Sequence, residues 1–102
     1  MKIIAVTSCP VGMAHTYMAS EALKKAGKAL GIEVLVETQG SMGIRDRIPE
    51  TAIKEADVFI DAADVAMIEG ERFDGMPRYK TSTSKLIKKG VEEIQKATAI
   101  IE

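Results

Sequence analysis

The feature that most constrains this chain is a continuous apolar run at residues 3–8, which ends in two small polar residues. A run without alternation is typical of a strand buried on both faces, and such strands belong to parallel sheets covered by helices. Residues 9–14 form a short loop rich in turn-forming residues, and the spacing of apolar positions predicts a helix over 15–30. The start of the chain therefore predicts a strand–loop–helix unit.

The rest of the chain continues this alternation. Further strands are predicted at residues 32–38, 57–61 and 77–81, and further helices at about 49–56 and 84–99, the last one interrupted near Gly90. The stretch 62–76 has no clear pattern. The alternating order predicts parallel strands with right-handed crossovers. Because the first and third strands are the most apolar, we expect a four-stranded parallel sheet of order 2-1-3-4 in a three-layer α/β/α, Rossmann-like fold, as one domain over residues 1–102.

Composition excludes several classes of function. The formal net charge is -1, so no whole-domain field favours nucleic acid, and any anion site must be local. No apolar run approaches the length of a membrane span, and the first residues read directly as a strand, with no signal peptide expected. The single cysteine excludes a disulfide within the chain. We expect a cytoplasmic monomer without a metal site.

Cys9 lies where a ligand is expected. In open parallel sheets, ligands bind in the crevice beyond the carboxyl ends of the central strands, and Cys9 directly follows the first of these. The small residues after it let the backbone curl, so that amide groups at a helix start can hold a tetrahedral dianion. The same field favours a thiolate, which makes Cys9 a candidate nucleophile. Pro10 has no N–H, so the predicted phosphate-binding residues are Val11, Gly12, Met13, Ala14, His15 and Thr16.

Two of these residues have side chains that can contribute directly. Thr16 can donate its hydroxyl to a phosphate oxygen or to the thiolate, and His15, the only histidine, can add a donor or a partial positive charge. Simpler interpretations exist for each: a lone cysteine is more often a buried core residue, and a lone histidine at a helix start is usually an incidental surface group. The position of Cys9 after a buried strand and before a glycine-containing turn favours the functional interpretation.

The segment from Cys9 to Thr16, Cys-Pro-Val-Gly-Met-Ala-His-Thr, closely resembles the Cys-Pro-Thr-Gly-Ile-Ala-His-Thr loop of the fructose-type enzyme IIB domains of the bacterial sugar phosphotransferase system. The resemblance covers essentially the whole chain. It includes three further motifs, at residues 37–41, 63–65 and 71–73. Val11 in place of threonine removes a hydroxyl from the loop, and Met13 in place of isoleucine is an apolar exchange.

The resemblance implies a phosphoryl carrier with the fold of IIB domains. Cys9 would accept phosphate from a phosphohistidine of a IIA partner and donate it to a sugar, fructose or a related hexose, held by the membrane permease IIC. No cofactor is implied beyond the covalent phosphocysteine. The carrier would be cytoplasmic and would meet the inner face of the membrane only transiently, through IIC. Residues that would flank the loop or touch a partner are Pro10, Gln39, Gly40 and Ser41.

Two alternatives stay open at this point. Low-molecular-weight cysteine phosphatases carry a cysteine, five residues, and then Arg-Ser/Thr; here the spacing fits, but His15 occupies the arginine position. That exchange removes the planar phosphate clamp. A phosphatase also needs a carboxylic acid, for which Asp61, Asp64 and Asp74 are candidates. The other alternative is a regulatory module with the fold of IIB but without transfer.

Apolar residues near the loop, Val11, Met13 and Met42, could contact a partner.

Overall fold

The computed structural model describes residues 1–9, 13–40 and 43–101. The elements in chain order are β1 (Lys2–Ser8), α1 (Met13–Leu30), β2 (Glu33–Gly40), β3 (Gly43–Arg45), α2 (Glu50–Glu55), β4 (Val58–Ala63), the 3-10 helix η1 (Gly70–Phe73), β5 (Arg78–Lys80) and α3 (Thr83–Ala99). All four strands and all three helices expected from the sequence are present, with ends shifted by one or two residues in most cases.

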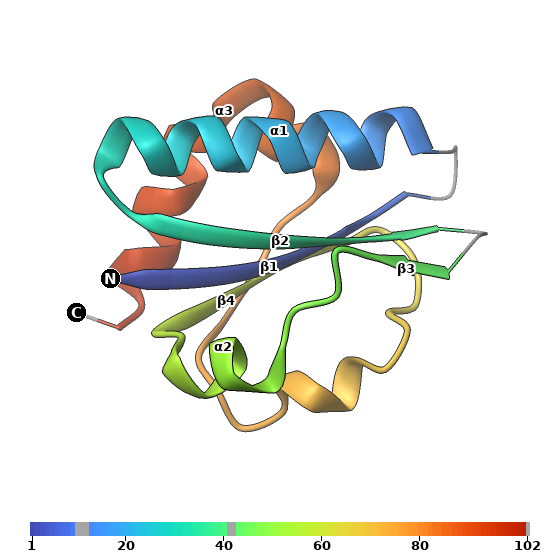
Figure 1. The fold of residues 1–102 in the computed structure, drawn as a ribbon. Helices are drawn as coiled ribbons and strands as arrows, with labels where there is room; N and C mark the ends of the chain where they lie inside the picture. Colours follow the sequence, from blue (N-terminus) through green and yellow to red (C-terminus); the bar gives the residue numbers. More distant parts are fainter. Residues whose placement is uncertain (10–12, 41–42, 102) are drawn as a thin grey trace.

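The strands form one sheet of order β3-β2-β1-β4-β5. β1 pairs in parallel with β2 and with β4, and β4 pairs in parallel with β5. The predicted order 2-1-3-4 is therefore confirmed for the four parallel strands. The strand count was wrong, because β3 adds a fifth strand, antiparallel to β2, so β2 is not at the edge of the sheet (Figure 1). A three-residue strand, Gly-Ile-Arg, is too short to show an alternating pattern.

The sheet has a hydrophobic core on each face. Alternation along β1 sends Ile3 and Ala5 toward α1 and α3, and Ile4 and Val6 toward the face that carries α2 and η1. On this second face, the rings of Phe59 and Phe73 stack with their centroids 4.2 Å apart. Figure 1 shows the resulting three layers, with α1 and α3 above the sheet and α2 and η1 below it. The layered α/β/α class predicted from the sequence is confirmed.

The C-terminal helix α3 packs closely against α1 on one face of the sheet. Ser82 caps α3 by accepting a hydrogen bond from the Lys85 amide, and Lys89 breaks the helical geometry with φ −139°. This break is the interruption that was predicted near Gly90. A side chain at Gly90 would place its Cβ 3.2 Å from the Ala22 carbonyl oxygen of α1, so the glycine permits the two helices to approach.

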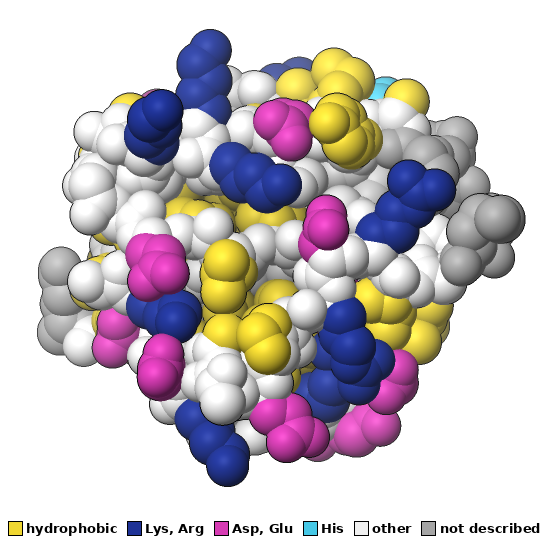
Figure 2. Space-filling view, in the orientation of Figure 1, with side chains coloured by type: hydrophobic (Ala, Val, Ile, Leu, Met, Phe, Trp, Pro, Cys, Tyr) yellow, Lys and Arg dark blue, Asp and Glu magenta, His cyan; other side chains and the backbone are white. Residues whose placement is uncertain are grey.

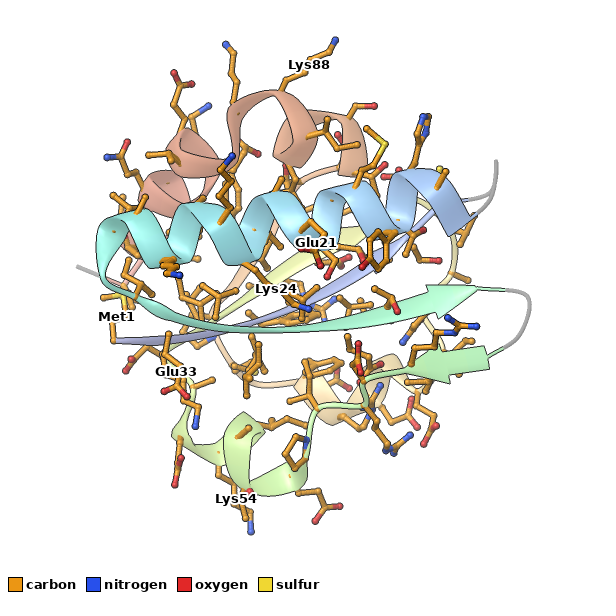
Figure 3. All side chains as sticks on the ribbon, turned by 45° about the horizontal axis from the view of Figure 1, so that its top comes forward. Met1, Glu21, Lys24, Glu33, Lys54 and Lys88 are labelled. Atoms are coloured by element: carbon orange, nitrogen blue, oxygen red, sulfur yellow. The ribbon has the colours of Figure 1, made fainter. Side chains whose placement is uncertain are left out.

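Charged side chains project from both outer layers, as Lys88 of α3 and Lys54 of α2 show in Figure 3. Within the described ranges, no helix combines the length and the apolar character that crossing a membrane requires.

Candidate functional site

The carboxyl end of β1 lies at the centre of the site. Ser8, its last residue, pairs with Gln39 of β2 on one side and with Ala63 of β4 on the other, and its carbonyl oxygen accepts a 2.8 Å hydrogen bond from the Asp64 amide. Cys9 follows Ser8 and is partly buried. Cys9 therefore directly follows the central strand, at the carboxyl edge of the sheet where the sequence predicts the ligand site (Figure 1).

His15 is the side chain that the structure places against the thiol. Its Nδ1 lies 3.9 Å from Cys9 Sγ, a long sulfur–nitrogen contact in which the donor depends on the tautomer of the imidazole. His15 belongs to the first turn of α1 and is exposed. Figure 2 shows the histidine beside hydrophobic side chains on the surface. The geometry lets the imidazole exchange a proton with the thiol or stabilise charge next to it.

Thr16 is the second predicted residue that the structure places at this edge. It is 1% exposed, and its carbonyl oxygen accepts a 3.2 Å hydrogen bond from Thr7 Oγ1, which ties the start of α1 to β1. Its own hydroxyl is buried and has no hydrogen-bond partner among the residues described. A buried hydroxyl without a partner is costly, and a phosphate oxygen is a suitable acceptor for it.

The remaining loop residues are described in part. Pro10, Val11 and Gly12 lie outside the described residues, so the predicted amide cradle stays a prediction there. Met13 is the first residue of α1 and Ala14 follows it on the exposed surface of the first turn. Both backbone amides thus belong to the N-terminal turn of α1, where amides have no partner within the helix.

Gln39 has a different environment from the one expected for a partner-contact residue. It is 1% exposed, and its Nε2 donates to Glu37 Oε2 at 2.8 Å and to the Ile68 carbonyl oxygen at 2.9 Å. Its Oε1 accepts from the Ile68 amide at 2.8 Å. Gly40 ends β2 and pairs with Gly43, and Ser41 lies outside the described residues. The described contacts of the Gln39 side chain are all internal, and a role of Gln39 and Gly40 in partner contact stays a prediction.

Glu37 belongs to the motif at residues 37–41, but the sequence predicts no role for its side chain. Its carboxylate is fully buried and accepts two hydrogen bonds from Arg72, at 2.9 and 2.8 Å, and one from the Ile48 amide at 3.0 Å. Burial would raise the pKa of this carboxyl, but the hydrogen bonds from Arg72, Gln39 and Ile48 outweigh burial and hold the pKa below its ordinary value. The motifs at residues 37–41 and 71–73 are thus in contact through the Glu37–Arg72 pair.

The carboxylates proposed as phosphatase acids have other partners. Asp61 contacts Lys80 at 3.3 Å and Arg78 at 3.6 Å, and Asp64 accepts from the Thr83 hydroxyl at 2.6 Å. Asp61 and Arg78 also line a cavity of about 250 Å³ on the η1 face, bordered by Asp74. Among the residues described, no group of three or more His, Cys, Asp or Glu side chains could hold a metal ion.

The mostly parallel α/β sheet, with a cysteine directly after its central strand and a helix beginning next to it, defines a class of proteins whose ligands bind at this edge of the sheet. The family model described as "PTS system, Lactose/Cellobiose specific IIB subunit" matches residues 4–97. The chain belongs to this family of phosphotransferase-system IIB components, as the loop resemblance predicted.

Comparisons with individual proteins agree. The chain is 47% identical over 98 residues to a fructose-specific EIIB'BC component of Xanthomonas campestris, covering 96% of the chain and 17% of that relative. It is 47% identical over 88 residues to the fructose-like EIIB component 2 of Escherichia coli, covering 86% of the chain and 83% of that protein. A crystal structure of a domain of the fructose-specific IIABC component from Borrelia burgdorferi superposes with a TM-score of 0.88 at 44% identity, over 96% of this chain and 93% of that one. The first of these relatives is therefore several times longer than the chain.

Proposed function

We propose that this chain is a phosphoryl carrier that accepts a phosphoryl group on Cys9 and passes it to a sugar. The observation that carries the proposal is the position of Cys9, at the end of the central strand with His15 Nδ1 3.9 Å from its sulfur. The proposed donor is a phosphohistidine of a IIA protein or domain. The proposed acceptor is a sugar held by the membrane permease IIC, to which the carrier binds transiently from the cytoplasm.

The chemistry consists of two balanced displacements. In the first, the Cys9 thiolate attacks phosphorus, an S–P bond forms, and the P–N bond of the donor histidine breaks as the leaving imidazole takes up a proton. In the second, a sugar hydroxyl attacks phosphorus, loses its proton, and the S–P bond breaks to restore the thiolate. In this proposal His15, whose Nδ1 lies 3.9 Å from Cys9 Sγ, receives the thiol proton, and the Thr16 hydroxyl together with the amides at the start of α1 binds the phosphate oxygens.

The same geometry favours a carrier over a phosphatase. A phosphatase must protonate the leaving group and then speed hydrolysis of the phosphocysteine. Here His15 occupies the position of the arginine clamp, and Asp61 and Asp64 are engaged by Lys80 and Thr83. A phosphocysteine without these groups can persist until an acceptor arrives. We therefore propose that Cys9 holds the phosphoryl group transiently, between its donor and its acceptor.

The sugar is proposed from the relatives. The names of the Xanthomonas and Escherichia coli proteins specify fructose or a fructose-like system, whereas the family description specifies lactose and cellobiose. Because these two relatives are each 47% identical to the chain, we favour fructose or a related hexose as the sugar. No cofactor is needed in this scheme, since the phosphoryl group is carried covalently.

Incubation with a fructose-type IIA protein phosphorylated on its histidine tests the proposal. Intact mass should show one added phosphoryl group on the wild type and none on Cys9→Ala. Hydrolysis of an aryl phosphate is the parallel assay, and the carrier should give none above the Cys9→Ala background. A wild type that stays unmodified, as a regulatory module would, or that turns over the aryl phosphate, contradicts the proposal.

A further inference from the structure

Asp64 belongs to the motif at residues 63–65, to which the proposed function assigns no role. It directly follows β4, and its backbone amide donates the 2.8 Å hydrogen bond to the Ser8 carbonyl oxygen, beside the last residue pair of β1 and β4. The Ser8 carbonyl and the Cys9 amide are parts of one planar peptide group, which also contains the Cα atom of Cys9. The hydrogen bond from Asp64 therefore fixes the plane from which the Cys9 side chain projects.

The start of α3 holds the Asp64 side chain. The Thr83 hydroxyl donates to Asp64 Oδ2 at 2.6 Å, and Thr83 is 1% exposed. Because a buried hydroxyl without an acceptor is unfavourable, this contact keeps the Asp64 side chain in one position. Thr83 is also the first residue of α3, and the free amides of a helix N-terminus favour a nearby carboxylate. Asp64 thus connects the end of β1 to the start of α3.

A second contact connects the same end of β1 to the other helix of that layer. Thr7 is fully buried, and its Oγ1 donates to the Thr16 carbonyl oxygen of α1 at 3.2 Å. Since α1 and α3 cover the same face of the sheet (Figure 1), the two residues before Cys9 are both bonded to this layer, one directly and one through Asp64. In-line transfer needs such rigidity, because a misplacement of about 1 Å can cost about 100-fold in rate.

We propose that Asp64 is a positioning residue for phosphoryl transfer, which acts through the Ser8–Cys9 peptide group while Thr83 holds its side chain. The inference rests on the proposed function. In this role the Asp64 carboxylate is a hydrogen-bond acceptor, and its charge is not required. Without the Thr83 contact the Asp64 backbone can shift, the peptide group rotates with it, and Cys9 Sγ moves relative to the imidazole 3.9 Å away. The donor still binds, so the loss falls on the maximal rate of transfer.

Substitutions at Thr83 and Asp64 test this role. Thr83→Val removes the hydroxyl and keeps the shape of the side chain, Thr83→Ser keeps the hydroxyl, and Asp64→Asn keeps an acceptor oxygen without the charge. Initial rates of Cys9 phosphorylation are measured against the concentration of a phosphorylated fructose-type IIA protein. We expect Thr83→Val to lower the maximal rate about tenfold at an unchanged half-saturating donor concentration, and the other two to stay within about twofold of the wild type. Thr98→Val, which removes a hydroxyl that donates to the Gln95 carbonyl oxygen at the other end of α3, is the control and should match the wild type.

Alkylation of Cys9 by iodoacetamide separates positioning from a loss of structure. This small reagent needs no alignment with a bound protein, so Thr83→Val should react at the wild-type rate, and a changed alkylation rate would contradict the positioning role.

The remaining outcomes distinguish the two proposals. If the wild type takes up no phosphate, the proposed function fails and the positioning role fails with it. If the wild type is phosphorylated and Thr83→Val transfers as fast as Thr98→Val, the proposed function stands and the positioning role alone is refuted. A slow Asp64→Asn beside a fast Thr83→Val would show that the charge of the carboxylate matters instead of its contact with Thr83, which also overturns the role.

Discussion

Glu37 and Arg72 are 35 positions apart in the chain, yet they form a two-bond ion pair inside the molecule, with donor–acceptor distances of 2.9 and 2.8 Å. The pair joins the end of β2 to η1. It lies beside Gln39, which hydrogen-bonds to the Ile68 backbone. Through Arg72, which also donates to the Glu69 carbonyl oxygen, it connects the carboxyl end of β2 to the residue just before η1. Its strength is open to direct measurement.

Replacing Glu37 by glutamine should lower the free energy of unfolding by about 3 kcal/mol at pH 7, because it leaves the Arg72 charge without its buried partner. Urea unfolding followed by circular dichroism measures this. Glu69→Gln, which removes the partner of exposed Arg47, is the control and should cost far less. Equal losses for the two variants would contradict the assignment of the buried pair as the stronger one.

The pH dependence of the wild type gives a second view of Glu37. The pKa of this carboxyl is lower in the folded chain than its ordinary value of 4.5, so the carboxylate form is favoured by folding. Its contribution to stability is present above that ordinary value and is lost as pH falls through the lower folded pKa. Stability should therefore fall more steeply below pH 4.5 in the wild type than in Glu37→Gln. Parallel acid unfolding curves would count against this.

Tyr79 provides the corresponding test at alkaline pH. Burial, and then the Glu93 carboxylate, to which its hydroxyl donates at 3.2 Å, raise the pKa of Tyr79 above its ordinary value of 10.0. This contribution is complete below pH 10 and is lost as pH rises through the folded pKa. Tyr79→Phe should cost about 1 kcal/mol at pH 7, the value of a typical hydrogen bond, and should reduce the alkaline loss. Thermal melts at pH 7 and pH 11, with Tyr17→Phe as the exposed control, measure both effects.

Thr16→Val separates a catalytic from a structural role of the Thr16 hydroxyl. Because this buried group lacks a partner among the described residues, its removal should change stability by no more than about 1 kcal/mol. The rate of Cys9 phosphorylation should fall about tenfold or more if the hydroxyl holds a phosphate oxygen, because a hydrogen bond to a charged group contributes about 1.5 kcal/mol or more. Thr16→Ser keeps the hydroxyl and should retain most of the rate. A valine variant that transfers at the wild-type rate would show that the hydroxyl has no part in transfer.

Gly27 is packed too closely for any side chain. A Cβ at this position of α1 would clash with Val34 Cγ2 and lie 3.1 Å from the Ile32 carbonyl oxygen. Alanine would gain about 1 kcal/mol of helix propensity, but overpacking costs about 1–3 kcal/mol, so we expect Gly27→Ala to be destabilised or at best neutral in denaturant unfolding. Lys28→Ala, exposed on the same helix, should be close to neutral or slightly stabilised. A clear stabilisation of Gly27→Ala would contradict the packing at α1 and β2.

Much of the fold could be predicted because the strands differ in how apolar they are. β1 and β4 have the most apolar middles of the strands, which places them at the centre and predicts the order of the parallel strands. β3 could not be predicted, since three residues carry no period and an antiparallel edge strand is defined by its pairing with β2. The stretch 62–76 had no pattern because polar contacts from Gln39 and Glu37, distant in sequence, hold part of it.

The site could be predicted in its local part only. Cys9, His15 and Thr16 lie within eight positions of one another, so a strand–loop–helix unit brings them together. The hydrogen bond from the Ile68 amide to Gln39 could not be predicted from local sequence, because the two residues are 29 positions apart and such a contact leaves no pattern in a single sequence. Gln39 follows the strand predicted at residues 32–38 and is expected to flank the loop or touch a partner, whereas in the structure it lies within β2 and its side chain turns inward.

The proposed role of Cys9 as a transient phosphate carrier is tested most directly by following two quantities together after mixing with a phosphorylated fructose-type IIA protein. These are the phosphoryl group bound to the chain, localised by fragmentation mass spectrometry, and the inorganic phosphate released. We expect one phosphoryl group on Cys9, stable while no sugar and permease are present, with little free phosphate. Phosphate located on His15 instead, or rapid release of inorganic phosphate by the wild type, would contradict it.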